Sequence, residues 1–210
     1  MAARRNQVIR SQAIAERSSG GFDFTTAMRR VCDDMVARLP DLAHIRLEQV
    51  AVSFCQARKD VSHGMQASLT PLRFAGGATS TVRRGRRYTC QAVLDPAGRE
   101  YLYILNFYLP RFLNHSIEEK LSTIVHELWH ISPAFDGDLR RHSGRCYAHG
   151  ASQRAYDAHV SALARQWLAL DPPYAVYEFL ELDCQELAAE HGALYGTQIR
   201  APKLVPLDAA

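Results

Sequence analysis

The sequence predicts an α+β protein, because the segments with strand character lie together and are followed by segments with helical character. One further helical pattern, over residues 24–39, comes before the strands. The chain has 210 residues, 47% of them hydrophobic, which is enough for one globular domain with its own core. We expect residues 1–21 to form a flexible leader and residues 22–210 to form a single domain.

The expected elements follow from apolar spacing and from turn residues. Apolar side chains three and four positions apart, from Phe24 to Leu39, predict a helix that ends before Pro40. Alternating and β-branched residues predict strands within 44–57 and at about 65–74, 88–94 and 100–108. Turns are expected at Gly76-Gly77 and at Asp95-Pro96-Ala97-Gly98. Later helices are expected at about 116–131, 152–170 and 176–194, with an extended tail over 199–207.

The helix expected over residues 116–131 has clear ends and two different faces. Ser116 and Glu119 make a capping box that begins the helix, and Pro133 stops it. Its apolar residues form one stripe, Ile117, Leu121, Ile124, Val125, Leu128 and Ile131. At about 100° per residue, His126 and His130 fall roughly opposite that stripe, with Glu127 at its margin. One face is therefore suited to a core and the other to a cleft.

The pentapeptide His126-Glu127-Leu128-Trp129-His130 has the spacing of a zinc site with a general base. Side chains four positions apart on a helix lie one above the other, so both imidazoles can reach a single ion. Glu127 lies one step round the helix and can take a proton from a water that the ion activates. The sequence thus predicts a Zn²⁺ cofactor, with His126 and His130 as ligands and Glu127 as the catalytic residue.

A catalytic zinc usually has three protein ligands, so one more group must come from elsewhere in the chain. We favour His149, because Gly150 lets the backbone bend close to the ion and Ser152 can cap the helix that follows. His142 is the alternative, although its arginine neighbours oppose metal binding. The other candidates are Asp136 and the downstream glutamates Glu178, Glu181 and Glu186.

The motif and the His149-Gly150 pair at the head of the next helix resemble the minimal zincin metallopeptidases, including SprT-like proteins. The stretch TIVHELWHISPAFDGDLRRHSGRCYAHG is also similar to a group of uncharacterised prokaryotic and phage metallopeptidase-like proteins. This resemblance covers about residues 116–160. It implies a zincin-like fold: a small mixed twisted sheet with a backing helix, the HExxH helix below the cleft, and a helical C-terminal part. It also implies a peptide substrate paired with an edge strand, either 66–74 or 88–94.

The leading hypothesis is therefore a zinc metallopeptidase acting on a protein or peptide. One alternative is a metal-dependent hydrolase of another bond, such as a deformylase or nuclease, although Cys90 lacks the context of a deformylase ligand. Another is a non-catalytic binding module, which would not need Glu127. The donor that stabilises the oxyanion could be Tyr147, Tyr156, Tyr195 or His159. The metal ligands could be supported by hydrogen bonds to Asp136, Asp138 or Asp157.

Composition and charge bear on partners and location. The five cysteines are scattered without CxxC spacing, and the sequence shows neither an apolar signal region nor a long apolar stretch. We therefore expect a cytoplasmic protein without membrane contact. The net charge of +3 is mild, but Arg83, Arg84, Arg86 and Arg87 form a dense cluster. This cluster predicts either a weak nucleic-acid contact or a solvated hairpin loop.

Overall fold

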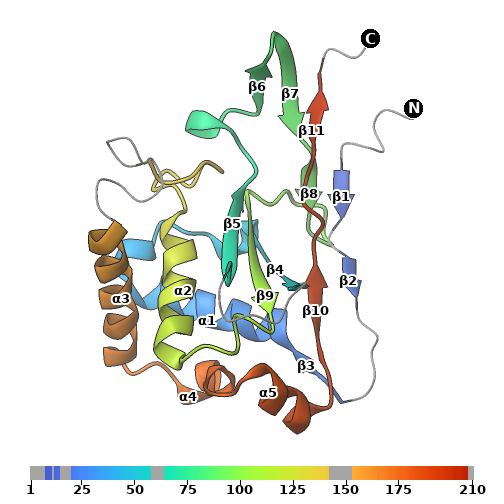
Figure 1. The fold of residues 1–210 in the computed structure, drawn as a ribbon. Coiled ribbons are helices and arrows are strands. Elements are labelled where there is room, and N and C mark those ends of the chain that lie inside the picture. The colour runs from blue at the N-terminus through green and yellow to red at the C-terminus, as the bar shows by residue number, and fades with distance from the viewer. Residues whose placement is uncertain (1–7, 11, 15–19, 58–63, 142–152, 208–210) are drawn as a thin grey trace.

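The structure is a computed structural model, and it describes residues 8–10, 12–14, 20–57, 64–141 and 153–207. It confirms the α+β class, with small sheets and, in the described part, five α-helices (Figure 1). The helices are α1 (Phe24–Arg38), α2 (Ile117–Trp129), α3 (Gln153–Ala169), α4 (Tyr174–Tyr177) and α5 (Cys184–His191). None of the helices in these ranges is long and apolar enough to cross a membrane.

The central sheet is small and mixed, as expected. It has the order β4-β9-β5 and consists of β4 (Val50–Gln56), β9 (Tyr103–Leu109) and β5 (Ala67–Pro71). Strand β9 runs parallel to β4 and antiparallel to β5, so β5 is an edge strand. The main core lies between this sheet and helices α1 and α2, where Phe24 packs edge-on against Phe107. Helix α1 therefore backs the sheet, and α2 lies beside its β5 edge.

Short strands make three smaller sheets around the central one. Their bounds are β1 (Val8–Arg10), β2 (Gln12–Ile14), β3 (Phe22–Asp23), β6 (Ser80–Arg83), β7 (Arg86–Cys90), β8 (Ala92–Leu94), β10 (Leu194–Gln198) and β11 (Leu204–Pro206). The sheets are β1-β8, β2-β10-β3 and β11-β7-β6. Within the segment expected to be a flexible leader, β1 pairs with β8 and β2 pairs with β10.

The expected helix over 176–194 is wrong, because this segment contains two short helices, a 3-10 turn and the start of a strand. Helix α4 passes into a 3-10 turn, Glu178–Glu181, and the chain is extended at Leu182. Asp183 then caps α5 in a second capping box, and Gly192 ends α5 with φ of 82°. Helical spacing of apolar residues does not reveal these interruptions, since all three pieces bury apolar side chains against the same core.

The strand expected at 88–94 and the basic loop expected at 83–87 also differ from the structure. The strand divides at Gln91 into β7, which pairs with β6 and β11, and β8, which pairs with β1. The loop is only a two-residue turn, Arg84-Gly85, with φ of 50° and 76°. The other arginines of the cluster belong to strands β6 and β7, because a two-residue turn with positive φ matches the twist of a hairpin.

Candidate metal centre

Helix α2 presents the motif at its C-terminal end and is fixed at its start. The capping box forms, because Ser116 Oγ accepts from the Glu119 amide at 3.3 Å and Glu119 Oε2 accepts from the Ser116 amide at 3.1 Å. The expected stripe is buried, including Leu121, Ile124 and Leu128. The helix ends at Trp129, with His130 as its C-cap residue.

A buried lysine ties α2 to the C-terminal part of the chain. Lys120 is only 1% exposed, and its Nζ donates to the carbonyl oxygens of Leu180 and Leu182, each at 2.9 Å. Burial lowers the pKa of Lys120, while the carboxylates of Asp183 and Glu186 act in the opposite direction. The lysine therefore serves as a donor that satisfies two carbonyls at the end of the 3-10 turn.

Replacing this lysine is expected to destabilise the protein. Lys120→Met keeps most of the apolar volume but leaves both carbonyls without their donor, so the free energy of unfolding should fall by about 2–4 kcal/mol. In a chain of this length the melting temperature should then fall by roughly 5–15 °C. Lys203→Met, at an exposed position, is the matched control and should melt like the parent. Equal melting temperatures for the Lys120 variant and the parent would show that the two hydrogen bonds of Lys120 do not contribute to the stability of the fold.

The two motif histidines meet at their ring nitrogens. His126 Nε2 and His130 Nε2 are 3.0 Å apart, and the two rings lie edge to face. Nitrogens that each bind zinc at about 2.0–2.1 Å in a tetrahedron lie about 3.3 Å apart. Both side chains are half-buried, so the pair is accessible from one side. The separation and the chemistry of the two donors therefore fit two protein ligands of a zinc ion.

Tyr156 from α3 packs on both imidazoles. Its ring stacks on His130 with centroids 5.6 Å apart and meets His126 edge-on at 5.0 Å. Tyr156 Oη lies 3.4 Å from His130 Nδ1 and 3.4 Å from the His126 carbonyl oxygen. Because the Tyr156 hydroxyl donates to the His126 carbonyl, its oxygen can accept from Nδ1–H of His130, and in this tautomer Nε2 carries no proton and can bind a metal. Burial raises the pKa of Tyr156, so the residue is a neutral phenol that orients His130.

Glu127 is more enclosed than its place on the helix predicted. It is 9% exposed, and burial raises the pKa of its carboxyl to about 7, although the Leu69 backbone amide hydrogen-bonds to it and acts in the opposite direction. A carboxyl group with a pKa near neutrality can both accept and return a proton. The Leu69 contact also places this carboxyl at the β5 edge of the sheet.

A cleft of about 570 Å³ contains His126 and Glu127. It lies between the start of β5, helix α2 and helix α3, and Asp157 and Ser161 form part of its α3 wall. Gln66 Oε1 accepts a hydrogen bond of 2.8 Å from Thr123 Oγ1 across this cleft, and so links the strand to the motif helix. The motif did not predict Gln66 or Ser161 as lining residues, since no local spacing relates them to the histidines.

Strand β5 offers main-chain groups to the same cleft. Among the strands that the structure describes it pairs with β9 only, and Pro71 at its end lacks an N–H, which is typical of an edge strand. The amide of Leu69 points to Glu127, and main-chain groups alternate in direction along an antiparallel strand. The N–H and C=O groups of Ala67 therefore point away from β9 at the cleft, whereas the N–H of Leu69 is already donated to Glu127.

The preferred third ligand, His149, and its alternative, His142, lie outside the described residues. Within the described part of the chain, no third histidine, cysteine or carboxylate joins the pair to make a three-ligand group. This finding removes the other candidates. Asp136 Oδ1 accepts from the Asp138 amide in its own loop, and Glu181 accepts from Tyr174 Oη. Glu186 belongs to the capping box of α5, and Glu178 is exposed in the 3-10 turn.

The residues expected to support the ligands have other neighbours. Asp138 binds Arg141 through both carboxylate oxygens, at 2.8 and 3.0 Å, and accepts from the Gly76 amide. Burial raises the pKa of Asp138, but the hydrogen bonds together outweigh it and hold the pKa below its usual value. Asp157 accepts from Gln153, and His159 packs on Trp129, which also lies under the guanidinium of Arg140. Tyr147 lies outside the described residues.

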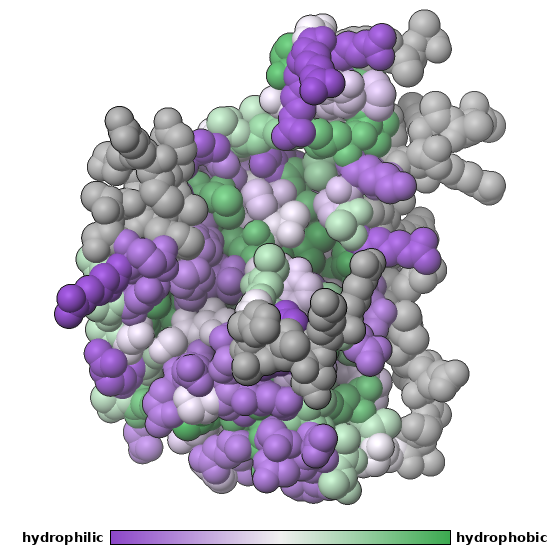
Figure 2. All heavy atoms as spheres, viewed as in Figure 1, coloured by the Kyte–Doolittle hydropathy of each residue, from purple (hydrophilic) through white to green (hydrophobic). Residues whose placement is uncertain are grey.

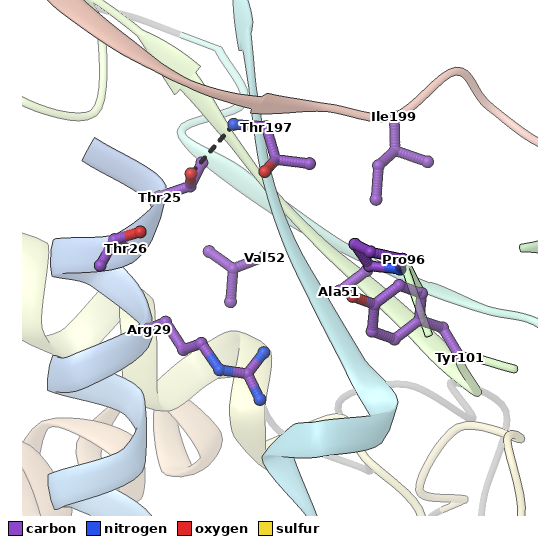
Figure 3. Close-up of a pocket in the computed structure, with 9 residues that line it drawn as sticks. All are labelled: Thr25, Thr26, Arg29, Ala51, Val52, Pro96, Tyr101, Thr197 and Ile199. Atoms are coloured by element: carbon purple, nitrogen blue, oxygen red, sulfur yellow. Dashed lines mark hydrogen bonds between the residues drawn. The ribbon is translucent and has the colours of Figure 1, made fainter. Parts of the chain in front are cut away.

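A second cavity, of about 250 Å³, lies between α1, β4 and β10 (Figure 3). Polar side chains that line it are already hydrogen-bonded to the backbone of the protein. Thr25 Oγ1 accepts from the Thr197 amide, and Arg29 donates to the carbonyl oxygens of Leu47 and Val50. We therefore place the candidate site in the cleft with the histidines, where the buried carboxyl and the open strand edge also lie.

Comparison with protein-family models, with curated proteins and with solved structures gives no match to this chain. The site is therefore described by its own chemistry: two imidazole nitrogens in contact and a buried carboxyl beside an edge strand.

Proposed function

We propose that this protein is a zinc-dependent metallopeptidase with a zincin-like fold. The observation that carries the proposal is that His126 and the buried carboxyl of Glu127 line one cleft, while the Nε2 atom of His130 lies 3.0 Å from that of His126. Helix α2 below an open edge of a small mixed sheet, with α1 behind the sheet, agrees with the architecture that the sequence resemblance implies.

His126 and His130 would hold the zinc, and His149, with His142 as the alternative, would complete the ligand set. The chemistry that zinc supplies when bound is Lewis acidity, which activates a water molecule at neutral pH. Glu127 would take a proton at a carboxylate oxygen from a water molecule in the cleft and would then return it to the leaving amine. Its burial excludes bulk solvent, and the raised pKa suits both proton transfers. Tyr156 keeps His130 in the tautomer that can bind metal.

The proposed substrate is a protein or peptide segment in extended form. The main-chain groups of Ala67 lie on the outer edge of β5 at the cleft and can pair with such a segment beside Glu127. The other candidate edge, residues 88–94, suits this role less well, because β7 is paired on both sides. The edge of β5 at the cleft favours peptide hydrolysis over a deformylase- or nuclease-like reaction. The buried carboxyl of Glu127 favours an enzyme over a binding module, which would not need it. The arginine cluster lies on the separate β6–β7 hairpin, so the proposed hydrolysis does not depend on it.

Zinc removal tests the proposal on the unaltered protein. We expect about one zinc per chain by mass spectrometry of the metal content, because a catalytic site of this kind holds one ion. Heat-denatured fluorescein-labelled casein should be cleaved, 1,10-phenanthroline should stop the cleavage, and added Zn²⁺ should restore it while Mg²⁺ does not. A protein that holds no zinc and whose activity is insensitive to the chelator is not a zinc peptidase.

A further inference from the structure

The β6–β7 hairpin ends in a tip that consists of residues 82–87. Arg83 and Arg86 are directly opposite each other across the two strands, and Arg84 and Gly85 form the turn. Val82 is opposite Arg87, on the other face of the ribbon, and is 66% exposed. Positive charge is therefore present on both faces of the ribbon and at its end.

This tip accounts for the positive charge of the whole chain. The chain has 25 Lys and Arg residues against 22 Asp and Glu, and without the four tip arginines it would have 21 against 22. All four arginines are exposed, and hydrophilic residues gather over the projecting hairpin at the top of Figure 2. In the described part of the chain, no salt bridge involves Arg83, Arg84 or Arg86.

Two features of the tip work against its stability. Like charges directly opposite each other on neighbouring strands repel, as Arg83 and Arg86 do. Arg84 has φ of 50°, a backbone conformation that glycine and asparagine adopt far more easily than arginine. Asparagine followed by Gly85 would make a better turn and remove one charge. An anionic partner would offset both costs.

We propose that the hairpin tip binds the phosphate backbone of nucleic acid. Guanidinium groups bind phosphates through two hydrogen bonds each, and a phosphate between Arg83 and Arg86 would turn their repulsion into attraction. Charge on both faces suits a ribbon that enters a groove between two phosphate strands, and a major groove about 12 Å wide admits such a ribbon. A flat membrane surface would contact one face of the ribbon only. The cleft takes no part in this contact.

The test compares two variants with the same change of charge. Arg83→Gln with Arg86→Gln removes the opposed pair, and Arg30→Gln with Arg154→Gln removes two exposed arginines elsewhere. Binding to fluorescein-labelled duplex DNA, single-stranded DNA and RNA is followed by anisotropy at about 50 and 200 mM salt. The parent should show a slope of log K against log salt of about −3 to −4 on its preferred nucleic acid. The affinity of the hairpin variant should be lower by roughly tenfold or more, and the magnitude of its slope should be smaller by about two. The affinity of the control variant should stay within about twofold of the parent.

A third variant separates binding from folding. Arg84→Asn should raise the melting temperature by roughly 1–3 °C, because asparagine tolerates the positive φ, and should still weaken nucleic-acid binding. A purely structural hairpin would gain stability without any change in binding. Glu127→Gln should bind nucleic acid like the parent, so failure of the peptidase proposal leaves this one standing.

Three results would overturn the proposal. They are the absence of binding by the parent at low salt, equal weakening by the control pair, and equal or tighter binding to polyglutamate or to phosphatidylserine vesicles. The last result would assign the tip to an acidic protein or to a membrane surface.

Discussion

Glu127→Gln is expected to abolish most peptide hydrolysis while leaving zinc in the protein. Glutamine preserves the shape of the side chain but cannot take the proton from water, so kcat/KM on denatured casein should fall by about 10²- to 10⁴-fold. The zinc content should match that of the parent, because His126 and His130 are unchanged. The variant should melt no lower than the parent, since the change removes a carboxyl whose ionised form burial disfavours.

Glu190→Gln is the matched control for this experiment. Glu190 is exposed on α5 and undergoes the same change of charge and shape far from the cleft. Its kcat/KM should stay within about twofold of the parent, as expected for a surface substitution. Full cleavage by the Glu127 variant, with zinc still bound, would exclude Glu127 as the general base and with it the proposed mechanism.

Substitutions around the histidine pair are expected to lower zinc affinity in a fixed order. His130→Ala removes a ligand, and the affinity should fall by about 10³-fold or more, beyond the 10- to 100-fold loss typical of a supporting residue. Tyr156→Phe keeps the packing on both imidazoles but removes the hydroxyl at His130 Nδ1, so the loss should be about 10-fold. His159→Ala, on the same helix as Tyr156 but packed on Trp129, should leave the affinity unchanged.

The three affinities can be measured by competition with a fluorescent zinc chelator. This readout does not depend on catalysis, so it reports the metal site even if the substrate differs from a peptide. Equal affinities for His130→Ala and His159→Ala would mean that the motif histidines do not hold the metal. An unchanged affinity for Tyr156→Phe would limit that residue to packing.

The α+β class and the motif helix could be read from local pattern alone. The capping box at Ser116, the buried stripe and the end of the helix before Pro133 all form as expected, because each depends on residues within one or two helical turns. The grouping of strands before helices predicts only the α+β class, whereas the small mixed sheet seen in the structure was implied by the resemblance to zincins. Local pattern failed at 176–194, where Asp183 and Gly192 interrupt what apolar spacing suggests is one helix.

The environment of the candidate site could not be read from local pattern. The burial of Glu127 arises from β5, which lies more than fifty residues earlier in the sequence, and the contact with Tyr156 arises from α3. Lys120 would be expected to be a solvated charge, yet it is buried against carbonyls some sixty residues later in the sequence. Such contacts depend on how distant elements pack, and no spacing within a single element encodes them.

The sequence by itself determined the chemistry that residues on one helix can share: two imidazoles four positions apart with a carboxylate between them, and a dense cluster of arginines on one short segment. The tertiary structure alone decided that β5 is the edge strand beside this carboxylate, that Arg83 and Arg86 stand opposite each other, and that Arg87 lies on the other face of the hairpin. The physical reason is that helical spacing is fixed by local hydrogen bonds, whereas strand order, register and burial are fixed by contacts between distant segments.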